Sequence, residues 1–363
     1  MIPIVRLRCV VRLASQENLL TQRSTEMIGS MRCHSRRQLL QGSLALAGFS
    51  LLLAGKAPGQ QAARGPRIGF LAVGTREGRA FMIEGFLKGL RDHGYVEGQN
   101  IVIEYRFSED RNDRLPALAD ELVALKVRLI LASGTPASFA AKEATSTIPI
   151  VIGTITDAVE TGLVTSLARP GGNITGMSSM SSLLAGKRLV LLKEIVPGLS
   201  RVAVFWNPLN PSYRPVLKEL EAAAPMLGVT LQRLEVRAPA DFAGAFEAAI
   251  RQRAGALIAP SDPLVVNRPR VVADLALKYR LPTTMDTKEF VEAGGVLSLG
   301  PDLVDSYRRA ANYVDKVLKG AKPADLPMEQ PTKFDLAVNL KTARTLGLTI
   351  PQSVLLQATQ VIQ

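Results

Sequence analysis

The chain has 363 residues, of which 47% are hydrophobic and 21% are charged, a composition typical of a globular protein with room for two domains. Much of its formal net charge of +12 lies at the N-terminus, because the residues after position 57 hold 36 Lys and Arg against 30 Asp and Glu, a net +6. A surplus of this size does not indicate nucleic-acid binding. Both cysteines, Cys9 and Cys33, also lie in the N-terminal part, so the remainder excludes disulfides and thiol chemistry.

The first predicted element is an export signal. Arg36 and Arg37 precede an apolar run over 44–55 (LALAGFSLLLAG), which is typical of a twin-arginine signal and too short for a membrane span, since a spanning helix needs about 20 apolar residues. A buried N-terminal helix is the alternative, but no polar second face marks one. Lys56 stands where a lipoprotein carries its lipidated cysteine. We therefore expect residues 1–63 to be removed, leaving a soluble periplasmic protein without a lipid anchor.

After the signal, short β-rich runs alternate with helical patterns, which predicts an α/β fold with parallel sheets. The first half contains predicted strands over 67–75, 100–107, 127–134 and 148–154, with helices ending at His93 and spanning about 111–126 and 136–144. The second half contains predicted strands over 201–208, 229–236, 255–262 and 281–287, with helices over 212–227 and 240–252 and a third ending at Arg280. The same order of predicted strands and helices occurs twice along the chain, which predicts two similar Rossmann-like lobes.

Two segments without periodicity, 168–179 and 320–327, are typical of connections between the lobes. A helix over about 302–319 precedes the second of them. A strand over 334–339, a helix from Leu340 and a loosely polar tail follow it.

Several predicted strands end on a capping residue followed by proline. The pairs are Thr135-Pro136, Asn210-Pro211 and Asp262-Pro263. Asp157 and Glu160 have the spacing of a capping box. Each of these residues can be a plain helix cap worth about 1 kcal/mol. Alternatively, helix N-termini converge beyond the carboxyl ends of the strands and hold an anion such as a carboxylate.

Motifs of common enzymes are missing from the sequence. It has no phosphate-binding loop, dinucleotide fingerprint, nucleophile elbow or HExxH motif. The one histidine after the signal, His93, lies at a predicted helix end, which favours a partner of the helix dipole over a catalytic base. One histidine without cysteine does not favour a transition-metal site. We expect Trp206 in the core and Asn207 facing the opposite way, where it could reach a ligand.

Three segments resemble the exported substrate-binding proteins of ABC transporters, a family with tryptophan- and tyrosine-binding members. They are GTPASFAAKEATSTIPIVIGTITDAVETGLVTSLARPGGNITG (134–176), KGAKPADLPME (319–329) and FDLAVNLKTARTLGLTIPQSVL (334–355). The likeness extends from Arg67 to the end of the chain. It implies a type I periplasmic-binding-protein fold, with two lobes joined by three crossings at a hinge. Lobe one would hold residues 64–176 and about 301–325, and lobe two 177–300 and about 330–363.

The resemblance also implies roles for individual residues. The turn from Ser133 to Pro136 would hold the carboxylate of an amino-acid-like ligand, and Asp286 would bind its ammonium group. This chain departs from the family after the first strand, where Thr75 and Arg76 replace a His-Pro-rich turn. Arg76 suggests an extra acidic group on the ligand or a loss of aromatic specificity. The expected ligand-binding residues are Thr75, Arg76, Ser133, Gly134, Thr135, Pro136, Thr156, Asp157, Asn207, Asp262 and Asp286.

The function implied is that of a periplasmic solute-binding protein of an ABC importer. We expect it to be a monomer that binds a small carboxylated ligand without a cofactor or metal, delivers it to an inner-membrane permease and does not bind nucleic acid. One alternative is a receptor for a membrane sensor. Another is an exported enzyme of the same fold, which would need a convergent acid/base pair. A transcription regulator is disfavoured by the export signal and by the lack of a helix-turn-helix segment ahead of Arg67.

Overall fold

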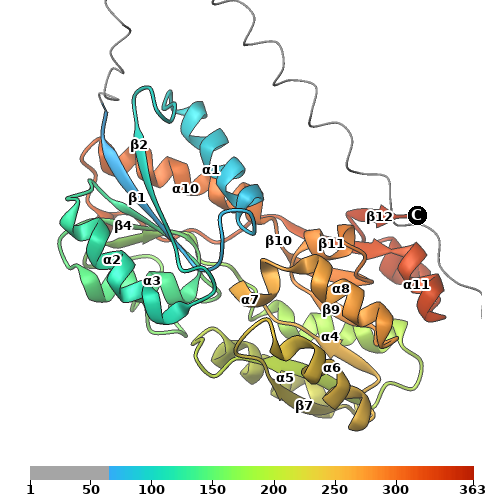
Figure 1. Ribbon diagram of the computed structural model, residues 1–363. Helices are drawn as coiled ribbons and strands as arrows, with labels where there is room; N and C mark the ends of the chain where they lie inside the picture. Colours follow the sequence, from blue (N-terminus) through green and yellow to red (C-terminus); the bar gives the residue numbers. More distant parts are fainter. Residues whose placement is uncertain (1–64) are drawn as a thin grey trace, which may run out of the picture. The chain divides into compact units, whose positions relative to one another are not determined.

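The computed structural model describes residues 65–363 (Figure 1). The predicted export signal, Lys56 and the two cysteines lie outside the described residues. Within the described part of the chain, no helix is long and apolar enough to cross a membrane. Two mostly parallel sheets with helices on both faces confirm the predicted α/β class with two Rossmann-like lobes.

The first sheet defines lobe one and is parallel throughout, with the strand order β2-β1-β3-β4-β5. Its strands are β1 (Arg67–Ala72), β2 (Val102–Phe107), β3 (Ile130–Ser133), β4 (Ile150–Thr154) and β5 (Ile174–Gly176). Its helices are α1 (Ala80–Asp92), α2 (Leu115–Ala124), α3 (Thr135–Ala144) and α10 (Leu303–Leu318), with the 3-10 turns η1 (Asn112–Arg114) and η2 (Pro323–Asp325). Helices α1 and α10 cover one face, and α2 and α3 the other (Figure 1).

The residues of β1 explain this layering. Ile68 and Phe70 are buried in the core beneath α1 and α10, whereas Leu71 and, just after the strand, Val73 are buried in the core beneath α2 and α3. A parallel sheet with both faces covered needs strands that are apolar on both sides. The near-continuous apolar run in the sequence therefore predicts a central strand.

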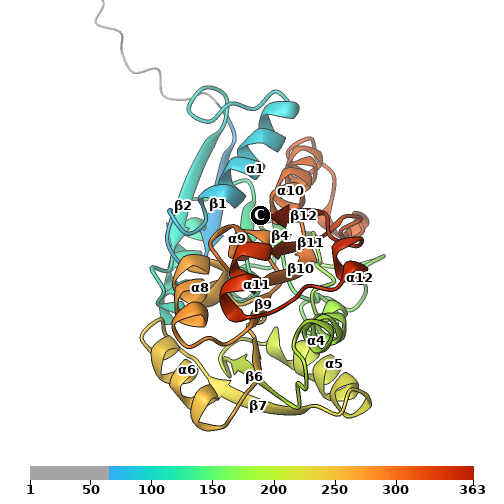
Figure 2. The ribbon, with the colours of Figure 1, turned by 90° about the vertical axis from the view of Figure 1, so that its right-hand side faces the viewer.

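The second sheet defines lobe two and has the strand order β12-β11-β10-β9-β8-β6-β7. Its strands are β6 (Arg201–Trp206), β7 (Thr230–Glu235), β8 (Ala256–Ile258), β9 (Thr283–Met285), β10 (Leu297–Pro301), β11 (Phe334–Asn339) and β12 (Gln360–Ile362). Its helices are α4 (Leu184–Ile195), α5 (Tyr213–Met226), α6 (Asp241–Arg251), α7 (Pro263–Val266), α8 (Pro269–Lys278), α9 (Lys288–Glu292), α11 (Leu340–Leu346) and α12 (Gln352–Leu355). Helices α4 and α5 lie on one face, and α6 and α8 on the other (Figure 2).

Three segments differ from the predicted elements. The single helix expected to end at Arg280 is two helices, because Pro269 begins α8 and the preceding Arg268 has φ −136°, outside the helical region. The expected connection 168–179 contains β5. The tail expected to be loosely polar contains α12 and ends in β12, which pairs in parallel with β11.

The chain passes between the two sheets three times. The first crossing is 177–183, the second is at Asp302, and the third is 326–333. A parallel bridge between Met177 and Glu329 joins the first crossing to the third. Asp302 also caps the start of α10. The crossings thus form the hinge that the family resemblance implies.

Candidate functional site

One pocket lies at the carboxyl ends of β4 and β9, with walls from both lobes, and this is the edge at which open parallel sheets bind ligands. Its cavity volume is about 40 Å³, well below the about 300–1,000 Å³ of typical small-molecule sites, so the pocket is tight in this conformation. Its lining residues are Arg79, Met82, Gly134, Thr135, Thr154, Ile155, Thr156, Ser179, Ser261, Pro263, Val266, Asp286, Thr287, Pro301 and Leu303.

The structure brings four of the predicted ligand-binding residues into the lining of this pocket. They are Gly134, Thr135, Thr156 and Asp286. The other predicted residues lie outside the lining, and most of them have structural partners elsewhere. They are Thr75, Arg76, Ser133, Pro136, Asp157, Asn207 and Asp262.

The turn before α3 presents the N-terminus of that helix to the pocket. Gly134 is the N-cap residue, with φ 95° and ψ 157°, a conformation that is essentially restricted to glycine. Thr135, which the sequence predicts as a cap, is instead the first helical residue, and α3 has no side-chain capping bond. Pro136 follows without an N–H group, and the remaining first-turn N–H groups give this end a partial positive charge. Ser133 faces away, with its Oγ 2.5 Å from the Tyr307 hydroxyl.

Arg79 lies against this turn, and the sequence alone did not identify it. It is 2% exposed, its Nε donates to the Val73 carbonyl at 2.9 Å, and its Nη1 lies 3.2 Å from the Met82 sulfur. Its Nη2 is buried and has no hydrogen-bond partner among residues 65–363. A Cβ placed on Gly134 would lie 3.5 Å from Nη2. Burial lowers the pKa of Arg79, and the negative charge of Asp262 opposes that shift, so the side chain remains a cation.

The arginine that the sequence did select, Arg76, lies outside the lining of this pocket. Its guanidinium lies 4.3 Å from the ring centroid of Tyr105, an arrangement typical of a cation–π contact. The neighbouring Thr75 accepts a hydrogen bond from the Gly78 N–H at 3.2 Å. The sequence does not show which of Arg76 and Arg79 lines the pocket, because both lie in the loop between the first strand and the first helix.

Asp286 lies on the opposite wall, directly after β9, and is 2% exposed. Its Oδ2 accepts a hydrogen bond from the Ser181 hydroxyl at 2.5 Å. Its Oδ1 and the Thr287 hydroxyl are buried and have no partner within the described part of the chain. Gly300 on β10 allows the close approach of the two strands here, because a Cβ at that position would lie 1.8 Å from the Asp286 carbonyl oxygen.

Asp262 is a buried structural acid beside the pocket. Its Oδ1 accepts from the Leu264 N–H at 2.7 Å, which confirms the predicted helix cap. Its Oδ2 accepts from Asn207 at 3.1 Å and from Asn210 at 2.8 Å. Burial raises the pKa of Asp262, and these hydrogen bonds oppose that shift. The residues on either side of Asp262 line the pocket, so this network fixes part of its wall.

The predicted capping box at Asp157 is wrong. Its Oδ1 accepts from the N–H groups of Val159 and Glu160 at 3.1 and 2.9 Å, but the segment is a turn and no helix begins there. The Glu160 carboxylate instead pairs with Lys218 of lobe two at 3.3 Å. Asp157 therefore shapes the loop that carries Thr156 into the pocket lining.

Two further polar contacts join the lobes away from the hinge. Arg268, in the break between α7 and α8, forms an ion pair with Asp110 of lobe one. The adjacent Asn267 donates to the Val73 carbonyl at 3.4 Å. Both contacts hold lobe two against the end of β1, so the lobes touch beside the pocket, an arrangement we call closed.

The predictions for Trp206 and His93 are also resolved by the structure. Trp206 packs on the core of lobe two, edge to face with Tyr213 at 5.7 Å between ring centroids. His93 is the C-cap residue of α1, with its Nε2 2.7 Å from Asn312 Oδ1. Both positions match the structural roles expected for these residues.

Comparison with known proteins gives a consistent set of similarities. A family model described as ABC transporter substrate binding protein matches residues 68–362. The tyrosine-binding protein of Clostridioides difficile (strain R20291) is 28% identical over 265 residues, which cover 73% of this chain and 76% of that protein. The ABC domain in complex with L-Trp from Streptococcus pneumoniae is 28% identical with a TM-score of 0.76, over 82% of this chain and 100% of that one. A conserved domain protein from Vibrio cholerae has a TM-score of 0.77 at the same identity and coverage.

Proposed function

Because the chain belongs to the ABC transporter substrate-binding protein family, we propose that it is the periplasmic receptor of an ABC importer and binds an amino acid between its lobes. In this proposal the protein acts as a monomer, closes on its ligand by bending at the three crossings and delivers it to an inner-membrane permease. The tyrosine-binding relative and the L-Trp complex both support an amino-acid ligand.

The observation that carries the proposal is a pair of buried, oppositely charged side chains lining the same pocket. Arg79 keeps Nη2 and Asp286 keeps Oδ1 without a hydrogen-bond partner among the described residues. A buried polar atom left without a hydrogen bond costs about 1–3 kcal/mol, and more where the group is charged, and a ligand that pairs with both atoms offsets that cost. An α-amino acid carries one carboxylate and one ammonium group, and therefore matches both.

The two walls divide the recognition between them. Arg79 and the N-terminus of α3 form a positive subsite for the carboxylate. Asp286 and the hydroxyl of Thr287 form a subsite that accepts hydrogen bonds from the ammonium group. The remaining lining includes apolar side chains that can receive an apolar part of the ligand, namely Met82, Ile155, Pro263, Val266, Pro301 and Leu303.

A thermal-shift screen tests the class of ligand. A protein that begins at residue 65 is screened against the protein amino acids, their deaminated acids, the corresponding amines and dicarboxylates. A compound present at 100 times its Kd should stabilise the folded protein by about 2.7 kcal/mol, which raises the melting temperature. We expect amino acids to be the strongest class. A panel in which dicarboxylates or amines alone raise the melting temperature would reject the zwitterion subsites.

Two variants test the subsites separately by calorimetric titration with L-tyrosine and 3-(4-hydroxyphenyl)propionate, which lacks the ammonium group. Asp286→Asn should lower the affinity for L-tyrosine by about 10- to 100-fold, since a hydrogen bond to a charged group contributes about 1.5–3 kcal/mol. The same variant should change the affinity for the deaminated acid less than about threefold. Arg79→Met should lower the affinity for both compounds, because both carry the carboxylate. An Arg79→Met protein that keeps its affinity for L-tyrosine would contradict the carboxylate subsite. If the screen selects another amino acid, that compound and its own deaminated acid replace this pair.

A further inference from the structure

Arg188 is a cation that lies entirely inside lobe two, at 0% exposure. It projects from α4, and its Nη1 donates to the Leu299 carbonyl at 2.8 Å. Its Nη2 donates to the Ser181 carbonyl at 2.7 Å and lies 3.4 Å from the Ser181 hydroxyl. These partners are carbonyls and a hydroxyl, not carboxylates. Burial lowers the pKa of Arg188, and Asp286 is the charged group that opposes the shift.

The two backbone partners of Arg188 lie in one connection between the lobes and in the strand that leads into another. Ser181 lies in the first crossing, 177–183, and Leu299 lies in β10, which runs directly into the second crossing at Asp302. One buried side chain therefore ties the first crossing, and the strand that leads into the second, to α4 of lobe two. A change in the path of the first crossing moves a hydrogen-bond acceptor of Arg188.

Ser181 connects this buried cation to the ligand pocket. Its hydroxyl donates to Asp286 Oδ2 at 2.5 Å and is within reach of Arg188 Nη2. The two carboxylate oxygens of Asp286 therefore differ. Oδ2 accepts the hydrogen bond from Ser181, and Oδ1 has no partner among residues 65–363. Ser181, whose hydroxyl orients the Asp286 carboxylate, lies in the first crossing. The orientation of this pocket acid therefore depends on the path of the hinge.

We propose that Arg188 and Ser181 are positioning residues that couple the hinge to the ammonium subsite. In the closed arrangement the first crossing places Ser181 so that Asp286 keeps one oxygen for the ligand. When the crossing changes its path, the Ser181 contact is lost and Asp286 is no longer held toward the pocket. The coupling favours ligands that carry an ammonium group over those that carry a carboxylate alone. This part rests on the proposed amino-acid function.

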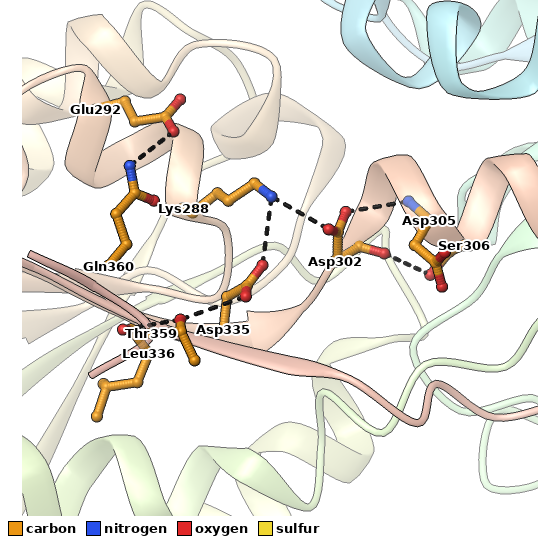
Figure 3. Close-up of polar contacts among 9 residues, drawn as sticks. All are labelled: Lys288, Glu292, Asp302, Asp305, Ser306, Asp335, Leu336, Thr359 and Gln360. Atoms are coloured by element: carbon orange, nitrogen blue, oxygen red, sulfur yellow. Dashed lines mark hydrogen bonds and ion pairs between the residues drawn. The ribbon is translucent and has the colours of Figure 1, made fainter. Parts of the chain in front are cut away.

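The chain provides a matched control on the same hinge. Lys288 of α9 lies 3.2 Å from Asp302 of the second crossing and 3.4 Å from Asp335 at the start of β11 (Figure 3). It therefore links the second crossing to the strand that follows the third, and within residues 65–363 its ammonium group makes no hydrogen bond or ion pair with Asp286. A variant at this position perturbs the hinge without touching the acid of the pocket.

The test compares Ser181→Ala, Arg188→Lys and Arg188→Met with Lys288→Met. For Ser181→Ala we expect about a tenfold loss of affinity for L-tyrosine and less than about a threefold loss for 3-(4-hydroxyphenyl)propionate. Arg188→Lys should retain more of this selectivity than Arg188→Met. Lys288→Met should change both affinities by the same factor. Equal losses for both compounds in Ser181→Ala, or no loss, would overturn the coupling.

A measurement on the ligand-free protein separates this inference from the proposed function. Hydrogen exchange should become faster in residues 177–183 in Ser181→Ala and in Asp286→Asn, and the double variant should exchange no faster than the faster single variant. This result stands even if L-tyrosine does not bind, which would reject the proposed ligand alone. Additive effects of the two substitutions, or unchanged exchange in this segment, would overturn the inference. Ser181→Ala keeps the test decisive if Arg188→Met fails to fold.

Discussion

Two arginines three positions apart in one loop have different environments. Arg76 lies over the Tyr105 ring, whereas Arg79 turns back beneath the end of β1 and bonds to the Val73 carbonyl. The sequence places both beside the expected pocket, and the resemblance to a known family drew attention to Arg76. Only the contact between Arg79 and the turn at Gly134 decides which cation reaches the pocket, because burial depends on packing between segments distant in the chain.

Glu289 provides a pH-dependent prediction at the level of one residue. Burial raises the pKa of Glu289 to about 7 from its ordinary value of 4.5. A carboxyl whose pKa is raised in the folded state binds its proton more tightly there than in the unfolded state. The favourable contribution of Glu289 to the free energy of unfolding is therefore complete below about pH 4.5 and is lost as the pH rises through 7.

We expect Glu289→Gln to raise the free energy of unfolding at pH 8 by about 1 kcal/mol or more, and to leave it nearly unchanged at pH 4.5. One pKa unit corresponds to about 1.4 kcal/mol, and partial exposure of Glu289 to solvent reduces the full value. Urea unfolding at the two pH values measures the difference. An equal effect of Glu289→Gln at both pH values would rule out the ionisation as its cause.

At the level of elements, the packing of α10 on the sheet of lobe one depends on a missing side chain. Tyr307 of α10 is fully buried, and its ring lies over Gly153 of β4. A Cβ on Gly153 would lie 2.6 Å from a carbon of that ring. The helix approaches the strand closely enough for the Tyr307 hydroxyl to reach Ser133, at the end of β3. The contact therefore joins α10 to two strands whose ends lead into the pocket.

Gly153→Ala should destabilise the protein by about 1–3 kcal/mol, because an added methyl group forces a well-packed core to shift. Chemical denaturation measures the loss. Gly244 in α6 is the matched control, since a Cβ there meets nothing within 4 Å and Ala at an open helical position is favoured by about 1 kcal/mol over Gly. If Gly153→Ala were as stable as the wild type, α10 would have to pack more loosely than the structure shows.

At the level of the whole described chain, the closed arrangement depends in part on contacts outside the hinge. Arg268 of lobe two pairs with Asp110 of lobe one, and their side chains are 21% and 20% exposed. A partly exposed pair of this kind contributes about 0.5–1 kcal/mol and is weakened by salt. In the proposed hinge bending the pair forms only when the lobes close, so its contribution should add to ligand affinity.

Arg268→Gln should therefore lower ligand affinity by about two- to fivefold at low salt and reduce its dependence on salt concentration. Titration at low and high sodium chloride, with the ligand found in the screen, measures both effects. Arg111→Gln is the control, because the Arg111–Asp113 pair lies within lobe one and is exposed. An equal change in both variants would show that the effect comes from net charge and not from closure of the lobes.

Much of the fold was predictable because strand and helix periodicities are local properties of the sequence. The strand predicted over 334–339 coincides with β11, and the repeated order of elements confirms two lobes. The predicted turn before α3 and the predicted acid after β9 both line the pocket, since parallel strands bring their carboxyl ends to one edge.

The sequence by itself determined the class of fold, the two lobes, the family, and two of the elements that frame the pocket. Only the tertiary structure decided that β11 runs antiparallel to β10, that Arg79 and not Arg76 reaches the pocket, and that Arg188 links the crossings to Asp286 through Ser181. Strand direction, burial and hydrogen-bond partnership are set by contacts between residues far apart in the chain. No local pattern records which of several similar side chains will make those contacts.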